Sequence, residues 1–85
     1  PDTETFRGLS LVLRAAGEGG SMPTVFNASN EKAVALFLNR QIGFLSIAEL
    51  IEKCMDHHRR IENPSLEQIL QTDAETYEYI ESIKA

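Results

Sequence analysis

The chain has 85 residues, of which 42% are hydrophobic and 25% are charged, and its formal charge is −5 at pH 7. This length suits one small domain, and the composition is that of a globular protein rather than a disordered segment. No apolar run approaches the roughly 18 residues that a membrane helix needs, and no basic stretch followed by an apolar one marks a secretory signal. We therefore expect a cytoplasmic protein without a membrane partner.

The negative charge is concentrated in residues 45–85, which carry nine acidic and four basic side chains. An acidic surface without a basic stripe repels phosphate backbones, and the chain has no tryptophan for base stacking. Nucleic-acid binding is therefore not expected. The single cysteine, Cys54, cannot form an internal disulfide, which suits a reducing compartment.

The first predicted helix covers residues 4–17 and ends at a glycine-rich stretch, residues 17–20. Its apolar residues recur at intervals of three and four, the spacing of one helical face. We expect this stripe to be buried: Phe6, Leu9, Val12, Leu13 and Ala16.

The second predicted helix, residues 22–39, is apolar around most of its circumference. Ser21 is a candidate N-cap, and Pro23 falls in the first turn, where a missing N–H costs nothing. A projection at 100° per residue places six apolar residues on one continuous arc: Met22, Phe26, Ala33, Val34, Phe37 and Leu38. A helix so widely apolar is predicted to be the central one, in contact with most of the others.

The third predicted helix covers residues 47–60. Ser46 and Glu49 have the spacing of a capping box at its start, and Glu49 and Lys53 have that of an i,i+4 ion pair. One face is apolar and is predicted to enter the core: Ile47, Ala48, Leu50, Ile51, Cys54 and Met55.

Two further short helices, residues 66–71 and 74–84, are predicted after the break at Asn63 and Pro64. Each begins with a capping-box pattern, Ser65 with Gln68 and Thr72 with Glu75. No stretch alternates long enough to be a strand. The predicted fold is therefore all-α, a small bundle of four to five helices around a central apolar helix at about residues 22–39, in a single domain over residues 1–85.

Asn27 and Asn30 are the polar residues most out of place, because both project into the apolar arc of the second helix. A buried carboxamide without partners costs about 1–3 kcal/mol, so each is expected to form hydrogen bonds inside the domain. The alternative is that they reach a ligand or another domain.

The remaining candidates for chemistry are weak. His57 and His58 are adjacent, so their side chains point about 100° apart on a helix, and no further ligand cluster accompanies them. His58 falls near a helix end, where a cation or a carbonyl-bonded imidazole is favoured. Cys54 is expected to be a buried structural thiol, and no glycine-rich phosphate loop is present. We predict no catalytic, cofactor-binding or metal-binding residue.

Residues 22–38 resemble a stretch found in deoxyxylulose-phosphate reductoisomerases, with the Asn-x-x-Asn-Glu core at Asn27, Asn30 and Glu31. Residues 42–47 and 64–74 are similar to two later pieces of the same family, in the same order and spacing. The departures are mild: Phe26 stands where leucine is usual, Ser29 where alanine is, and Ser46 where aspartate is.

The resemblance implies the carboxy-terminal helical domain of an enzyme of non-mevalonate isoprenoid biosynthesis. The full-length enzyme converts 1-deoxy-D-xylulose 5-phosphate to 2-C-methyl-D-erythritol 4-phosphate as a homodimer, with NADPH and a divalent metal, Mg or Mn. The nucleotide-binding and catalytic domains are absent from this chain and would be its partners. No catalytic position of the family has a counterpart here, so the chain alone is predicted to be inactive, with Asn27, Asn30 and Glu31 as structural or domain-docking residues.

A standalone small acidic helical adaptor or carrier-type protein is the alternative. In acyl carrier proteins a serine at a helix start takes phosphopantetheine, and Ser46 would be that serine. Leu45 precedes it where the carrier pattern has aspartate, and Glu49 already explains Ser46 as a cap. Two α/β domains encoded upstream would favour the reductoisomerase interpretation.

Overall fold

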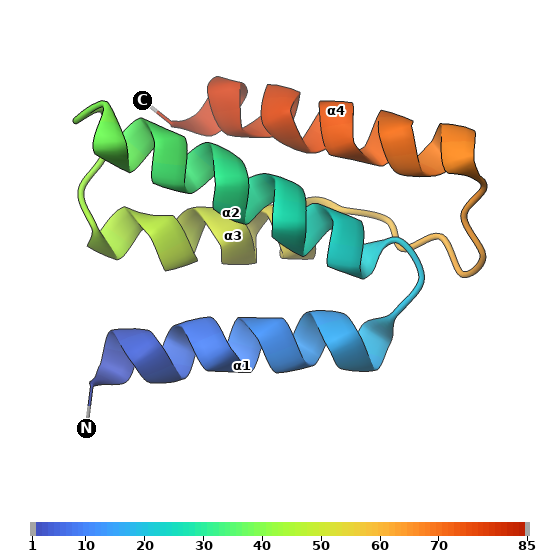
Figure 1. The fold of residues 1–85 in the computed structure, drawn as a ribbon, viewed down its shortest axis with the longest axis horizontal. Coiled ribbons are helices and arrows are strands. Elements are labelled where there is room, and N and C mark those ends of the chain that lie inside the picture. The colour runs from blue at the N-terminus through green and yellow to red at the C-terminus, as the bar shows by residue number, and fades with distance from the viewer. Residues whose placement is uncertain (1, 85) are drawn as a thin grey trace.

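The computed structural model describes residues 2–84, and all regular elements within that range are helices. They are α1 (Thr3–Glu18), α2 (Met22–Leu38), α3 (Leu45–His57) and α4 (Leu66–Ile83). Consecutive helices run in opposite directions, with α1 and α4 at opposite edges and α2 and α3 between them (Figure 1). The predicted all-α bundle is confirmed, with four helices.

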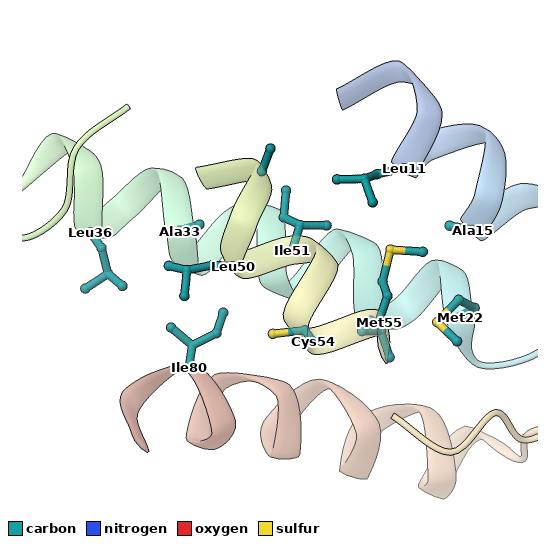
Figure 2. Close-up of a cluster of buried hydrophobic side chains, with 12 residues drawn as sticks. Leu11, Ala15, Met22, Ala33, Leu36, Leu50, Ile51, Cys54, Met55 and Ile80 are labelled. Carbon is teal, nitrogen blue, oxygen red and sulfur yellow. The ribbon is translucent and has the colours of Figure 1, made fainter. Parts of the chain in front are cut away.

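The predicted central position of α2 is also confirmed, because α2 packs against each of the other three helices. Val25 and Ala33 of α2 have no exposed surface. Leu11 of α1 and Ile80 of α4 point into the same cluster from opposite edges, around the buried face of α3 (Figure 2). Between residues 2 and 84, α1 and α4 make no contact with each other, so each covers a separate side of the α2–α3 pair.

The apolar face predicted for α3 is buried as expected. Ala48, Leu50, Ile51, Cys54 and Met55 all lie in the core, and Ile47 packs against it. On the opposite face the predicted i,i+4 pair is present, with Lys53 Nζ 3.1 Å from Glu49 Oε1.

The last third of the chain differs from the prediction, because residues 66–83 form one continuous helix rather than two. The predicted second start at Thr72 is wrong: Thr72 is 2% exposed, and its carbonyl accepts a hydrogen bond of 2.8 Å from Thr76 Oγ1. Thr72, Thr76 and Ile80 form the buried line of α4, and packing of this line outweighs the local capping pattern. The first capping box, Ser65 with Gln68, is confirmed in both directions.

The start of α3 was also predicted incorrectly. The helix begins at Leu45, its N-cap is Phe44, and no side chain caps it, so Ser46 lies within the first turn. The Phe44 ring packs edge-on against Phe37 of α2, with ring centroids 5.8 Å apart. The start of α3 thus lies against α2 through an aromatic contact and has no serine cap.

The turn between α1 and α2 is built against the segment that follows α3. Gly19 and Gly20 have positive φ angles of 62° and 58°, a region that favours glycine. A Cβ on Gly20 would overlap the carbonyl oxygen of Ile61. The adjacent Ser21 N–H donates to that same carbonyl at 2.9 Å. Glycine at position 20 is therefore what lets the two segments approach so closely.

Candidate docking surface

Helix α1 exposes an apolar face to solvent. Phe6, Leu9 and Leu13 are 61%, 52% and 62% exposed. They recur with Ala16 at intervals of three and four, so all four lie on one side of the helix. We call these four residues the outer α1 face. A surface helix of a soluble protein normally turns such a stripe toward the core.

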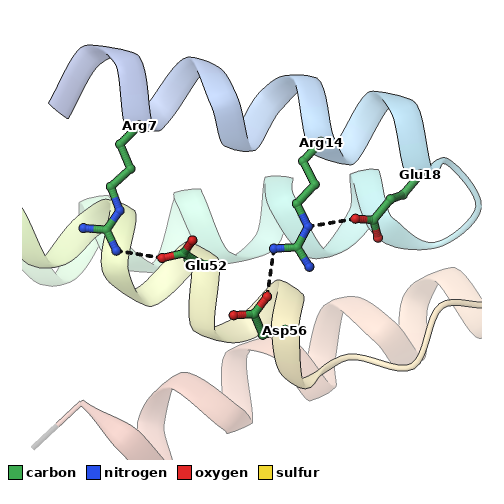
Figure 3. Close-up of polar contacts among 5 residues, drawn as sticks. All are labelled: Arg7, Arg14, Glu18, Glu52 and Asp56. Atoms are coloured by element: carbon green, nitrogen blue, oxygen red, sulfur yellow. Dashed lines mark hydrogen bonds and ion pairs between the residues drawn. The ribbon is translucent and has the colours of Figure 1, made fainter. Parts of the chain in front are cut away.

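The opposite side of α1, which faces the bundle, is narrow and largely charged. Only Leu11 and Ala15 are buried there. Arg7 reaches Glu52 of α3 at 2.9 Å, and Arg14 reaches Asp56 of α3 at 2.8 Å. Both arginines extend from α1 toward α3 (Figure 3). Arg14 also pairs with Glu18 one turn along its own helix, at 2.7 Å.

The predicted buried stripe of the first helix is therefore wrong. Its periodicity was read correctly, but the bundle binds the other side of the helix, at Leu11 and Ala15. Neither Arg7 nor Arg14 is among the residues predicted from the sequence to matter. A signal for them was present in the two arginines on one helix and the two carboxylates, Glu52 and Asp56, on another.

Asn27 and Asn30 do not lie in the core, contrary to the preferred interpretation of the sequence. Both are exposed on the side of α2 that faces away from the bundle. The helical projection placed them correctly beside Val34 and Leu38, but that half of the arc is at the surface, with Leu38 71% exposed. The buried half is formed by residues such as Val25, Ala33 and Leu36.

Glu31 has a defined role inside the domain. Its carboxylate accepts a hydrogen bond from the Tyr77 hydroxyl of α4. This hydrogen bond raises the pKa of Tyr77 to about 12. The next residue, Lys32 of α2, pairs at 3.0 Å with Glu81 of α4, which lies one turn beyond Tyr77. Glu31 therefore helps to hold α4 on the central helix.

Ser21 is a buried polar residue whose role differs from the N-cap predicted for it. It occupies the N-cap position of α2 but makes no side-chain cap. Its hydroxyl accepts a hydrogen bond of 2.8 Å from the Ile61 N–H and lies 2.7 Å from Nε2 of His58. A neutral imidazole with its proton on Nδ1 can accept the Ser21 proton at Nε2. The hydroxyl thus ties the α1–α2 turn to the end of α3.

His58 is suited to that neutral form. Burial lowers its pKa from the ordinary value of 6.5, the neighbouring His57 also lowers it, and Glu75 acts in the opposite direction. For a histidine at this helix end, the sequence predicts either a cationic ring or a hydrogen bond to a carbonyl. The partner of the His58 ring is instead the Ser21 hydroxyl. The difference arises because a tertiary contact, not the helix dipole, controls this ring.

A hollow of about 760 Å³ lies between the end of α3 and α4. The rings of His57 and Tyr79 stack in its lining at a centroid distance of 3.9 Å. Cys54 also lines it, but burial raises the pKa of the thiol to about 11, so the thiol is protonated at neutral pH. Its predicted burial is confirmed, and a neutral thiol is a poor nucleophile.

Within residues 2–84, no three His, Cys, Asp or Glu side chains gather as a metal site requires. No helix in that range is long and apolar enough to cross a membrane. The outer α1 face is an exposed apolar stripe of the kind found where one domain packs on another.

The chain is similar to the carboxy-terminal part of longer known proteins. Residues 1–79 match the family described as the DXP reductoisomerase C-terminal domain. The 1-deoxy-D-xylulose 5-phosphate reductoisomerase of Agathobacter rectalis is 54% identical over 80 residues, which cover 94% of this chain and 21% of that protein. The enzyme of the same name from Halalkalibacterium halodurans is 48% identical over 82 residues, covering 96% and 22%.

The chain thus spans about a fifth of the length of these relatives and aligns to their carboxy-terminal part. It is a helical domain that corresponds to the carboxy-terminal part of these relatives. Specifically, it belongs to the C-terminal domain family of DXP reductoisomerase, an enzyme of isoprenoid biosynthesis. This membership does not support the alternative of a standalone carrier with Ser46 as its modified residue.

Proposed function

We propose that this chain is the supporting carboxy-terminal domain of an NADPH-dependent reductoisomerase. That enzyme would convert 1-deoxy-D-xylulose 5-phosphate to 2-C-methyl-D-erythritol 4-phosphate in the non-mevalonate pathway. The observation that carries the proposal is the family match over residues 1–79, together with the name shared by relatives about half identical to the chain. The enzyme would act in the cytoplasm as a homodimer.

The cofactors of this reaction would bind to the part of the enzyme that precedes the domain. The donor set in residues 2–84 does not fit a divalent metal, because no three candidate ligands meet. The sequence also lacks a glycine-rich loop of the kind that holds a nucleotide phosphate. The chain itself would supply packing surface and a rigid bundle, with Asn27 and Asn30 as exposed polar residues that contact the other domains.

The test uses a chimera in which this chain replaces the matching carboxy-terminal stretch of the Agathobacter rectalis enzyme. NADPH oxidation is followed with 1-deoxy-D-xylulose 5-phosphate and Mg²⁺ or Mn²⁺. We expect the chimera to be active, the enzyme deleted for that stretch to be inactive, and the chain alone to be inactive. An inactive but folded chimera, or turnover by a clean preparation of the chain alone, would overturn the proposal.

A further inference from the structure

We propose that the outer α1 face, Phe6, Leu9, Leu13 and Ala16, is the surface on which the preceding part of the same polypeptide packs in the full-length enzyme. This inference rests on the proposed function and deepens it, because it names the docking surface. It assigns one occupant to that surface, the enzyme's own amino-terminal portion.

Charge is distributed unevenly around α1. Its four charged residues, Glu4, Arg7, Arg14 and Glu18, lie on the same side as Leu11 and Ala15, toward the bundle. The outer half of the helix carries no charged side chain at all. Water-exposed helices show the reverse arrangement, whereas the centre of a protein interface is depleted of charge and rich in apolar side chains.

Helix α1 is fixed in this orientation by contacts with α3. Arg7 and Arg14 bind Glu52 and Asp56 on α3, two anchors one heptad apart (Figure 3). Rotating α1 to bury Leu9 and Leu13 would break both pairs and bring Leu11 into solvent. The exposure of the outer α1 face is therefore a consequence of specific contacts on the other side of the helix.

The length of the relatives indicates what can cover this face. The relatives are about five times as long as the stretch they share with this chain, and the shared stretch is their carboxy-terminal part. Their additional polypeptide therefore precedes the segment equivalent to α1. Helix α1 lies at one edge of the bundle and does not touch α4 within residues 2–84, so its outer side is open to that polypeptide (Figure 1).

The chain offers a matched control on the opposite edge. Leu66 and Leu70 of α4 are 73% and 63% exposed, as much as Leu9 and Leu13, and also lie one turn apart. The double variants Leu9→Gln/Leu13→Gln and Leu66→Gln/Leu70→Gln remove the same chemical groups from the two edges. In the isolated chain, both are expected to leave the melting temperature within about 3 °C of the unsubstituted chain, because all four side chains are exposed.

In the chimera with the Agathobacter rectalis enzyme, the two double variants should diverge. The α1 double should lower activity about tenfold or more and make the domain sensitive to limited proteolysis, since two central interface leucines are lost. The α4 double should stay within about twofold of the unsubstituted chimera. An α1 double indistinguishable from the α4 double would overturn the inference.

Photochemical side-chain oxidation gives a second measurement that does not depend on any variant. Phe6, Leu9 and Leu13 should be labelled in the isolated chain and protected in the chimera. If they stay labelled in an active chimera, the inference fails while the proposed function stands. If the chimera is folded but inactive, it is the proposed function that fails. A chain that sediments alone as a dimer, and as a monomer once Leu9 and Leu13 are changed, would assign the face to a second copy and also overturn the inference.

Discussion

His58 is a titratable side chain in a position that disfavours its charged form, since burial lowers its pKa from the usual 6.5. In the unfolded chain the ring takes up a proton as the pH falls through about 6.5, while in the folded chain it stays neutral to lower pH. The unfolded state then binds more protons, so the free energy of unfolding decreases as the pH falls. We expect the melting temperature to drop between pH 7.5 and 5.5.

Two substitutions separate this effect from the carboxylates that titrate at lower pH. His58→Gln removes the titrating ring, so the change in melting temperature between pH 7.5 and 5.5 should become smaller. His57→Gln is the comparison and should retain most of the dependence, because burial contributes more than His57 to the lowered pKa of His58. Equal pH profiles for the His58→Gln variant and the unsubstituted chain would contradict the assignment to His58.

Gly20 is a backbone position at which a side chain would be costly. It combines a φ of 58° with contact to the Ile61 carbonyl, which an added Cβ would overlap. Gly20→Ala is expected to destabilise the chain by about 2–4 kcal/mol, lowering the melting temperature by roughly 8 °C or more. Gly17→Ala is the control, because that glycine is helical with open space around it. It should stabilise the chain by about 0.5–1 kcal/mol, and equal effects of the two changes would contradict the prediction.

Asn30 tests whether the conspicuous asparagines of α2 serve this domain or its neighbours. Because Asn30 is exposed, Asn30→Ala should change the stability of the isolated chain by no more than about 0.5 kcal/mol. If the side chain contacts another domain, the same change should lower the activity or the melting temperature of the full-length chimera. Loss of 1 kcal/mol or more in the isolated chain, measured by thermal or urea unfolding, would return Asn30 to a role inside the bundle.

At the scale of the elements, the sequence predicts which segments are helical much better than how they end. The breaks predicted at the glycines and at Asn63–Pro64 correctly separate the four helices, because those residues act on the local backbone. The break predicted inside α4 fails because Thr72 and Thr76 contribute to the core, and that packing is not visible in a local capping pattern. The start of α3 is also missed, because the Ser46 capping pattern is not used there and the N-cap is Phe44, which packs against Phe37 of another helix.

The candidate site shows the same division between local and tertiary information. Periodicity identifies the apolar stripe of α1 and the angular positions of Asn27 and Asn30 on α2. Which side of each helix faces the bundle depends on distant partners, such as Glu52 and Asp56 for α1. An exposed apolar stripe is therefore mistaken for a core-facing one when every apolar stripe is assumed to have its packing partner within the same chain.

The end of α2 contains an element-scale strain that a substitution should relieve. Arg40 has a φ of 60°, the left-handed conformation that closes many helices and is usually taken by glycine. The Gln41 N–H closes the motif with a hydrogen bond of 2.9 Å to the Leu36 carbonyl. Arg40→Gly is expected to raise stability by about 0.5–1 kcal/mol, because it removes the Cβ clash. Arg40→Ala removes the same charge but keeps the Cβ, and a comparable gain from it would attribute the effect to charge instead.

At the scale of the whole molecule, the four helices are not equally well held. Helix α2 contacts all of the others, whereas α1 contacts only α2 and α3 within residues 2–84. The buried part of α1 amounts to Leu11 and Ala15. Its two ion pairs to α3 are partly exposed, and such pairs contribute about 0–1 kcal/mol each. We therefore expect α1 to be the least stable helix of the isolated chain.

Native-state hydrogen exchange measures this order directly. Amides in the middle of α1 should exchange about tenfold or more faster than those in the middle of α2, because α1 can open without unfolding the rest of the bundle. Raising the ionic strength should widen the difference, since salt screens the pairs at Arg7 and Arg14. In the full-length chimera the same α1 amides should approach the protection of α2, because the outer α1 face is then covered. Equal protection of α1 and α2 in the isolated chain would mean that the bundle unfolds as one unit and that α1 needs no neighbour to be stable.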